Sequence, residues 1–266
     1  MARPRFTVLR AIFRLGMAEA IAYRTALFVW ILTSCFPLIA LAMWSGIAGE
    51  SSVGAYTQKD FVGYFVAAFL VRQLTSCWVV WDLERQIASG DLSTLLLRPV
   101  HPLLHHLVTN LAALPVRLVL AVPLGFGVLW MAGGASIEAN TYSWLLVVPA
   151  LIGAWLINFS AQVIIGCLAF WWTRTSALFE VWLGLFVVLS GYVVPIRLMP
   201  EAVVAVLDLL PFHASLGFIV ELLLGELSLG TALRGLALQW GWVVVLGLLA
   251  RLAWRRGLRV YGAVGT

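Results

Sequence analysis

The sequence predicts an all-α, polytopic membrane protein with six transmembrane helices, an N-terminal interfacial helix and a re-entrant pair of outer helices between spans five and six. The composition is the first observation behind this prediction: 62% of the 266 residues are hydrophobic and 11% are charged, whereas a soluble domain carries roughly 25% charged residues. The second observation is the division of the chain into long apolar segments, and the third is the uneven distribution of arginines between the loops. Together they predict a single transmembrane domain over residues 1–266.

Six apolar segments are candidates for membrane insertion, near residues 26–47, 61–81, 107–132, 144–172, 178–195 and 235–254. A helix that crosses the bilayer needs about 20 residues, so each segment is a candidate span, and the fifth is the shortest. The first segment exceeds the roughly 7–15 residues of a signal-peptide core. We therefore predict that it is retained as a span rather than cleaved.

The basic residues predict the orientation of these spans. With the N-terminus in the cytoplasm, the inner regions hold twelve arginines: Arg3, Arg5, Arg10, Arg14, Arg24, Arg85, Arg98, Arg174, Arg251, Arg255, Arg256 and Arg259. The outer regions then hold only Lys59, Arg197 and Arg234. Because cytoplasmic loops carry an excess of Lys and Arg, both termini are predicted to be cytoplasmic. The net charge of +5 is thus a topology signal, and no nucleic-acid partner is expected.

Residues 5–24 precede the first span and have the periodicity of an amphipathic helix. Apolar side chains recur at spacings of three and four residues: Phe6, Leu9, Phe13, Met17 and Ala20. Because Arg10 and Arg14 lie beside this stripe, we predict a helix in the cytoplasmic interface. A basic tail that only lipid orders is the alternative.

The most informative polar break is the run QIASGDLSTLLLRPVHPL at residues 86–103. The side chain of Ser89 or Asp91 can cap a short leucine-rich helix. Pro99 then stops this helix at Arg98. A leucine-rich helix outside the bilayer indicates a docking partner, and an ordinary loop on lipid headgroups is the alternative. The contacts predicted for this partner are Leu95, Leu96 and Arg98.

The region 196–231 is too apolar for a free loop and too broken for a single span. Pro195, Pro200 and Pro211 punctuate it, and irregular backbone at membrane depth must be shielded by protein. Two short helices that dip into the outer leaflet satisfy both constraints. We therefore predict a re-entrant outer region here.

Charged residues within or beside the apolar segments are costly unless they are paired or wetted. Arg72, Arg117 and Glu180 are the candidates in this class. Arg72 either contacts an anionic solute or pairs inside the bundle, and the sequence leaves both interpretations open. For Glu180, an ion pair with Arg174 at the inner end of the fifth segment is the simpler prediction.

Residue type and spacing exclude several sites. Lys59 is the only lysine and Asp60 follows it, so the phosphate-binding loop G-x-x-x-x-G-K-[ST] is absent and ATP is not bound by that route. His101, His105 and His106 have no carboxylate within several residues, which favours a solvated or headgroup-facing cluster over a metal site. We expect no catalytic residue, metal or cofactor in this chain.

Three stretches together resemble one family. The run GDLSTLLLRPVHPL resembles the cytoplasmic loop of ABC-2 type transporter permeases, specifically a six-span subgroup once described as a domain of unknown function. The positions that match are Gly90, Leu95 to Leu97, Arg98, Pro99 and Pro102. The other similar stretches are Gly191 to Pro200 with Leu210-Pro211-Phe212, and Arg259-Val260-Tyr261-Gly262-Ala263. The resemblance covers essentially the whole chain.

The resemblance implies a permease subunit of an ATP-binding cassette transporter in the inner membrane of a prokaryote. Its partners would be two copies of a separately encoded ATPase subunit, which bind ATP and Mg²⁺, and a second permease, identical or paralogous. The residues that would couple to the ATPase are Gly90, Asp91, Leu92, Leu95, Leu96 and Arg98. Family substrates vary, and we expect export of an amphipathic or lipid-like solute.

In such a permease, residues 196–225 would form a re-entrant helical pair that closes the pathway on the outside, with Leu209 and Phe212 as gate contacts. A static lid over the dimer surface is the alternative for this segment. Two other classes of function stay open: a membrane-embedded transferase or hydrolase, which would need clustered acids or histidines at a membrane boundary, and a non-catalytic assembly protein.

Overall fold

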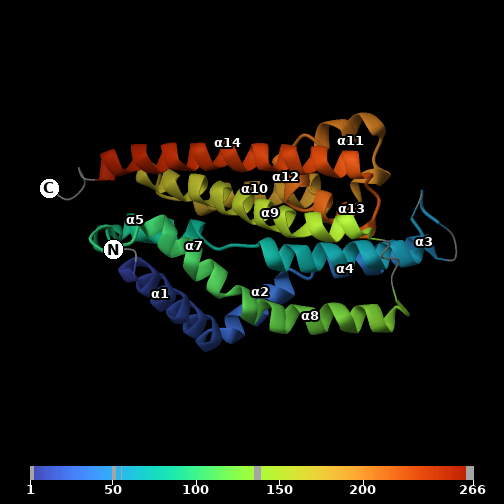
Figure 1. The fold of residues 1–266 in the computed structure, drawn as a ribbon, viewed down its shortest axis with the longest axis horizontal. Coiled ribbons are helices and arrows are strands. Elements are labelled where there is room, and N and C mark those ends of the chain that lie inside the picture. The colour runs from blue at the N-terminus through green and yellow to red at the C-terminus, as the bar shows by residue number, and fades with distance from the viewer. Residues whose placement is uncertain (1–2, 50–51, 55, 135–138, 262–266) are drawn as a thin grey trace.

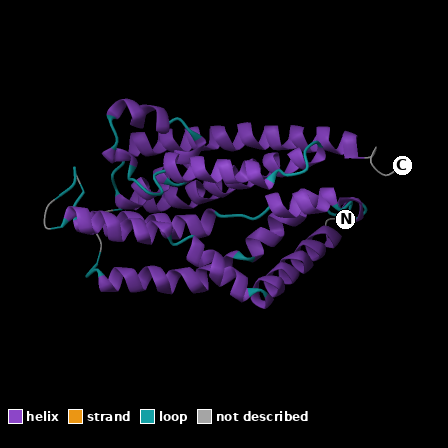
Figure 2. Ribbon diagram, turned by 180° about the vertical axis from the view of Figure 1, so that it is seen from behind, coloured by secondary structure: helices purple, strands orange, loops and turns teal. Residues whose placement is uncertain are grey.

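The computed structural model shows an elongated bundle whose long helices run along one common direction (Figure 1). The structure describes residues 3–49, 52–54, 56–134 and 139–261. Within these ranges the regular structure is helical, and the only strand-like pairing is an isolated bridge between Val53 and Tyr56 (Figure 2). The predicted all-α fold is confirmed for the described part of the chain.

The helices of the N-terminal half are α1 (Arg3–Ala22), α2 (Arg24–Thr33), α3 (Phe36–Ala48), α4 (Gln58–Thr75), α5 (Val80–Ala88), α6 (Leu92–Leu96), α7 (Pro102–Ala112) and α8 (Leu114–Met131). Those of the C-terminal half are α9 (Thr141–Cys167), η1 (Leu168–Phe170), α10 (Ser176–Leu189), η2 (Ile196–Leu198), α11 (Glu201–Leu207), α12 (Pro211–Ser215), α13 (Gly217–Leu224) and α14 (Leu229–Tyr261).

Four stretches are long and apolar enough to cross a bilayer: Gln58–Ala88, Pro102–Met131, Thr141–Phe170 and Leu229–Tyr261. They correspond to the second, third, fourth and sixth predicted spans. The first predicted span is divided at residues 34–35 into α2 and α3, and the fifth forms α10, whose 14 residues rise about 21 Å. The first and fifth segments are therefore shorter apolar helices, and a count of six spans stays a prediction.

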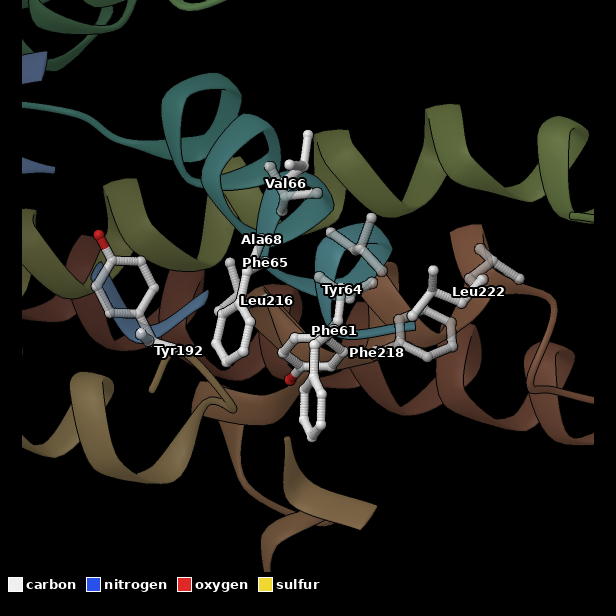
Figure 3. Close-up of a cluster of buried hydrophobic side chains, with 14 of the residues drawn as sticks. Phe61, Tyr64, Phe65, Val66, Ala68, Tyr192, Leu216, Phe218 and Leu222 are labelled. Atoms are coloured by element: carbon white, nitrogen blue, oxygen red, sulfur yellow. The ribbon is translucent and has the colours of Figure 1, made fainter. Parts of the chain in front are cut away.

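The largest enclosed cluster joins α4 to α9 and to the outer helices α12 and α13. Phe61, Tyr64 and Phe65 of α4 are almost completely buried there, together with Leu216 and Leu222 (Figure 3). The α9 helix is buried over most of its length, which agrees with its apolar sequence on all faces. This packing fixes the outer half of the bundle as one body.

Both described ends of the chain lie at the same end of the bundle, beside α5 and α7 (Figure 1). The polar run at residues 86–103 connects those two helices, and the outer region with α11 lies at the opposite end. The helix predicted at residues 5–24 is present as α1, while its position in a membrane interface stays a prediction. The bundle thus has a loop end, where the start of α1, the end of α14 and α6 lie, and an outer end.

The outer region differs from the predicted pair of helices. Three short α-helices follow one another, α11, α12 and α13, after the 3₁₀ turn η2. Pro200 and Pro211 stand at the starts of α11 and α12, where a missing N–H costs nothing. Residues 211–222 are buried inside this same chain. The segment therefore holds three short helices rather than the predicted two, because a break at Leu216, which is not a proline position, separates α12 from α13. That these helices are re-entrant stays a prediction.

Candidate functional site

The predicted coupling loop contains the short helix α6. Gly90 precedes this helix with φ of 82°, a left-handed conformation that favours glycine. Asp91 occupies the N-cap position, but its carboxylate accepts a hydrogen bond from the Ser89 hydroxyl at 2.7 Å and makes no bond to the helix backbone. The predicted side-chain cap is therefore wrong. Instead, the Ser93 hydroxyl donates to the Gly90 carbonyl at 2.7 Å, which ties the first turn to the loop.

The leucines of the coupling loop divide between the core and the surface. Leu92 and Leu95 are 0% and 8% exposed and pack in a buried cluster with side chains of α5, α9 and α14. Leu96 and Leu97 are 39% and 89% exposed. The α6 helix is thus fixed to the bundle on one side and presents leucines to its surroundings on the other. Leu92 and Leu95 are thus covered by the bundle itself, while the coupling roles of Gly90, Asp91, Leu92, Leu95, Leu96 and Arg98 stay predictions.

The C-terminal end of α14 is joined to the same loop. The hydroxyl of Tyr261 donates to the carbonyl of Gly90 at 2.8 Å and accepts a hydrogen bond from the backbone N–H of Ser93 at 3.2 Å. The Tyr261 ring also packs edge-on against Phe170, with ring centroids 5.7 Å apart. Two stretches that the sequence presents as separate motifs therefore form one structural unit at the loop end.

Helix α1 borders the other side of the loop. A small hollow of about 150 Å³ lies between Val8 and Ile12 of α1 and the loop residues Arg98 and Pro99. Helix α1 also packs along α7, the helix that follows the loop. The coupling loop is thus held between the N-terminal and C-terminal helices of the chain.

The second predicted span, Gln58–Ala88, is broken at residues 76–79, where the chain is extended between α4 and α5 (Figure 1). Backbone groups freed within a membrane must find partners inside the protein, and side chains of α7, α8 and α9 provide them. The bonds are Asn158 Nδ2 to Thr75 O (3.3 Å), Arg117 Nη1 to Ser76 O (2.7 Å), Gln162 Nε2 to Cys77 O (2.7 Å), Trp78 N to Asn110 Oδ1 (2.7 Å) and Val79 N to Gln162 Oε1 (2.9 Å). The break is therefore a built feature with its own hydrogen-bond partners.

The three charged candidates of the apolar segments lie in different environments. Arg117 is 4% exposed and bonds to the carbonyl and hydroxyl oxygens of Ser76. The Arg72 guanidinium lies over the Phe186 ring, 4.6 Å from its centroid, in a cation–π contact. Glu180 is exposed, and the ion pairs among the described residues do not include it. The structure does not bring the three together, and the predicted Glu180–Arg174 pair is wrong.

A buried ionic cluster lies at the outer end. The Arg197 guanidinium bonds to Glu221 at 2.5 Å and to Asp208 at 3.4 Å. The two ring nitrogens of His213 each lie 3.3 Å from a carboxylate oxygen, one of Asp208 and one of Glu221. Glu221 is 2% exposed. Burial opposes its ionisation, but the hydrogen bond and charge of His213, with those of Arg197, hold the pKa of Glu221 below its usual value.

Tyr56 and Glu226 extend this outer network towards the preceding loop. The Tyr56 hydroxyl donates to the carboxylate of Glu226, with oxygens 3.0 and 3.2 Å away. Desolvation, with the nearby negative charge of Glu221, raises the pKa of Glu226 to about 7. Desolvation also raises the pKa of Tyr56, and Glu226 adds to this effect. Glu226 is therefore poised to change its charge near neutral pH.

Comparison with protein families identifies the chain. A model of the ABC-2 family transporter protein matches residues 27–265, a range that includes the broken span, the coupling loop and the outer cluster. The chain belongs to the ABC-2 transporter family. It is thus an integral membrane protein and a permease subunit of an ABC transporter. Subunits of this family are transmembrane and not themselves catalytic, and membership implies an ATPase partner. No curated protein matches the chain.

The two residues predicted as gate contacts in this ABC-2 permease lie in unlike settings. Leu209 is 61% exposed, and its carbonyl accepts a hydrogen bond from the Trp242 indole of α14 at 2.9 Å. Phe212 is 7% exposed and packs against Trp182 of α10, with ring centroids 4.6 Å apart. Of the two, Leu209 is the side chain left exposed for a further contact.

The histidines near the loop have separate structural roles. The His101 Nδ1 accepts a hydrogen bond from the N–H of Leu103 at 3.2 Å and so caps α7. His106 is buried, with its Nε2 3.0 Å from Gln86 Oε1. These contacts place the histidines in the walls and caps of the loop end.

Sequence reasoning missed most of the side chains that hold the broken span. Asn158 and Gln162 of α9 are not among the residues that the sequence singles out, yet both bond to the backbone of the break. The signal that could have found them is an amide in the middle of a long apolar segment, because such a group needs a partner inside the protein. Tyr261 was part of a motif, but its contact with Gly90 joins residues 171 positions apart and no local pattern encodes it.

Proposed function

We propose that this ABC-2 permease exports an amphipathic or lipid-like solute, driven by ATP hydrolysis on two copies of a separate ATPase subunit. A second permease, identical or paralogous, completes the pathway. The protein resides in the inner membrane of a prokaryote with both termini in the cytoplasm, and the outer region at residues 196–225 closes the pathway on the outside. The single observation that carries the coupling part of this proposal is the two-sided helix α6.

The two sides of α6 suit it to pass on movement. Its exposed leucines, Leu96 and Leu97, offer an apolar contact to the ATPase, while the buried Leu92 and Leu95 hold the helix against α5, α9 and α14. A push on the exposed side would therefore move α5 and the end of α14 with the loop. The extended residues 76–79 lie between α4 and α5. They provide a point at which α5 can turn relative to α4.

Replacing Leu96 and Leu97 together with Asp is expected to abolish co-purification of the ATPase, because the substitutions put charge on the contact without removing the buried anchors. The measurement is affinity purification of the tagged permease in mild detergent, followed by an assay of vanadate-sensitive ATP hydrolysis. The wild-type chain should bring this activity with it.

The matched control is Leu104→Asp in α7, since Leu104 is 38% exposed, close to the exposure of Leu96, and lies outside α6. This variant should retain the ATPase. Equal recovery of ATPase activity with the double variant, at equal amounts of inserted permease, would contradict the proposed contact surface.

A further inference from the structure

A large open hollow lies beside the break in the second span, at the loop end. Its volume is about 730 Å³, and α1, α5, α7 and the start of α8 form its walls. Trp78 of the extended segment contributes to it, as do Asn110 and Arg117, which bond to that segment. Ligand sites usually have volumes of about 300–1,000 Å³, so the hollow is too large for a bare ion and suits the headgroup of an amphipathic molecule.

The buried charge in this hollow is a cation. Arg117 is 4% exposed, and its hydrogen-bond partners, the oxygens of Ser76, are neutral. None of the ion pairs among the described residues includes Arg117. A guanidinium inside a membrane span is costly unless a counter-charge accompanies it. Within the described part of the chain, no carboxylate pairs with this position.

Two of the three guanidinium nitrogens of Arg117 are not used in these hydrogen bonds. Its Nη1 serves the backbone of the broken span, while Nε and Nη2 make no hydrogen bond to the described residues. Neither nitrogen is among the fully enclosed polar atoms without a partner, and Arg117 is part of the lining of the hollow. Two neighbouring guanidinium N–H groups match the oxygens of a phosphate or carboxylate in a bidentate pair.

The acids at this site do not neutralise Arg117. Asp82 pairs with Arg85 at 2.9 Å, and both are at least partly exposed. Glu19 of α1 lies in the wall and is exposed, and its carboxylate makes no hydrogen bond or ion pair with the described residues. The carboxylates of Asp82 and Glu19 are therefore exposed at least in part. The buried charged side chain of this hollow is Arg117, which is positive.

We propose that this hollow binds the phosphate-bearing headgroup of an amphipathic lipid from the leaflet at the loop end, with Arg117 as the phosphate ligand and Trp78 as part of the wall. Because Arg117 also holds the Ser76 carbonyl, occupancy of the site would be sensed directly at the break between α4 and α5. The inference rests on the proposed function only for the role of this lipid as the exported solute.

The test measures binding to the purified full-length permease in nonionic detergent, without any ATPase, by microscale thermophoresis. Three probes separate the parts of the ligand: dioctanoyl phosphatidic acid, dioctanoylglycerol, which lacks the phosphate, and glycerol 3-phosphate, which lacks the acyl chains. Phosphatidic acid should bind and dioctanoylglycerol should not. Equal binding of these two lipids would overturn the proposal, whereas glycerol 3-phosphate binding as tightly as phosphatidic acid would keep the phosphate site and assign it to a soluble ester.

Variants then locate the site. Arg117→Gln should weaken phosphatidic acid binding at least tenfold, because it removes a charge-assisted contact. Since this change also touches the broken span, Glu19→Lys provides an independent test on an exposed side chain and should tighten binding severalfold. The matched control is Glu201→Lys in α11, the same change of charge at an exposed position of the outer end.

Equal affinities of the Glu19→Lys and Glu201→Lys proteins for phosphatidic acid would overturn the assignment of the site. The experiment contains no ATPase, so its failure would leave co-purification through Leu96 and Leu97 unchanged. Conversely, loss of the proposed coupling would leave lipid binding to the isolated chain unaffected. The two proposals can therefore fail separately.

Discussion

Replacing Arg197 with Met is expected to lower the free energy of unfolding by about 3 kcal/mol, since breaking a buried ion pair leaves an uncompensated charge. Glu221, its partner, is 2% exposed, while Arg197 is 33% exposed, so we take the lower end of the range for buried pairs. In a chain of this size, that loss corresponds to a fall in the unfolding midpoint of roughly 6–12 °C. The measurement is thermal unfolding of the detergent-solubilised permease.

Arg234 provides a matched control for Arg197, because both arginines line one hollow at the outer end of the bundle. Arg234 lines the outer hollow together with Arg197 and Glu221, but it takes part in none of the ion pairs among the described residues. Arg234→Met should therefore leave the midpoint nearly unchanged. The double variant Arg197→Met with Glu221→Gln should recover part of the loss, because the buried charge is removed with its partner. Equal midpoints for the two single arginine variants would contradict a stabilising role for the outer cluster.

Replacing Gln162 with Leu is expected to destabilise the permease by about 2–6 kcal/mol, because each of two backbone groups would lose its partner at roughly 1–3 kcal/mol. The Gln162 amide serves both the Cys77 carbonyl and the Val79 N–H. Leu is similar in volume, so the loss reports on polar contacts rather than on a cavity. The readout is the same thermal unfolding measurement.

Ser160→Ala is the control for this prediction. Ser160 lies on the same helix and is 8% exposed, but its hydroxyl makes no hydrogen bond to the described residues. Its removal should change the midpoint little. If Gln162→Leu behaved like Ser160→Ala, the extended segment at residues 76–79 would not depend on α9, and the account of the broken span would be wrong.

The parts of the fold that follow from local pattern could be predicted from the sequence. The apolar stripe of residues 5–24 gave α1, and the proline-terminated leucine run gave α6. The break at residues 76–79 could not be predicted in this way, since it contains no proline or glycine. It depends on side chains more than 30 positions away, such as Asn110 and Gln162.

The sequence locates the short helix of the coupling loop but does not show which of its side chains the bundle covers. Helical spacing can place Leu92 and Leu95 on one face of α6, but it does not say that the bundle itself covers this face. Likewise, Arg197 and Glu221 lie 24 positions apart and meet only because α12 and α13 fold back into the core. Contacts of this kind depend on tertiary packing, which a single sequence does not reveal.

The central claim is that α6 passes the movement of an ATPase subunit to the bundle, and site-specific cross-linking tests it most directly. A photoreactive amino acid at position 97, where Leu97 is 89% exposed, should form an adduct with the ATPase subunit in native membranes. The same residue at position 233, where Leu233 is 49% exposed in the outer part of α14, should not. An ATPase adduct from position 97 alone is the predicted result. Its absence there, in a complex that hydrolyses ATP, would contradict the account.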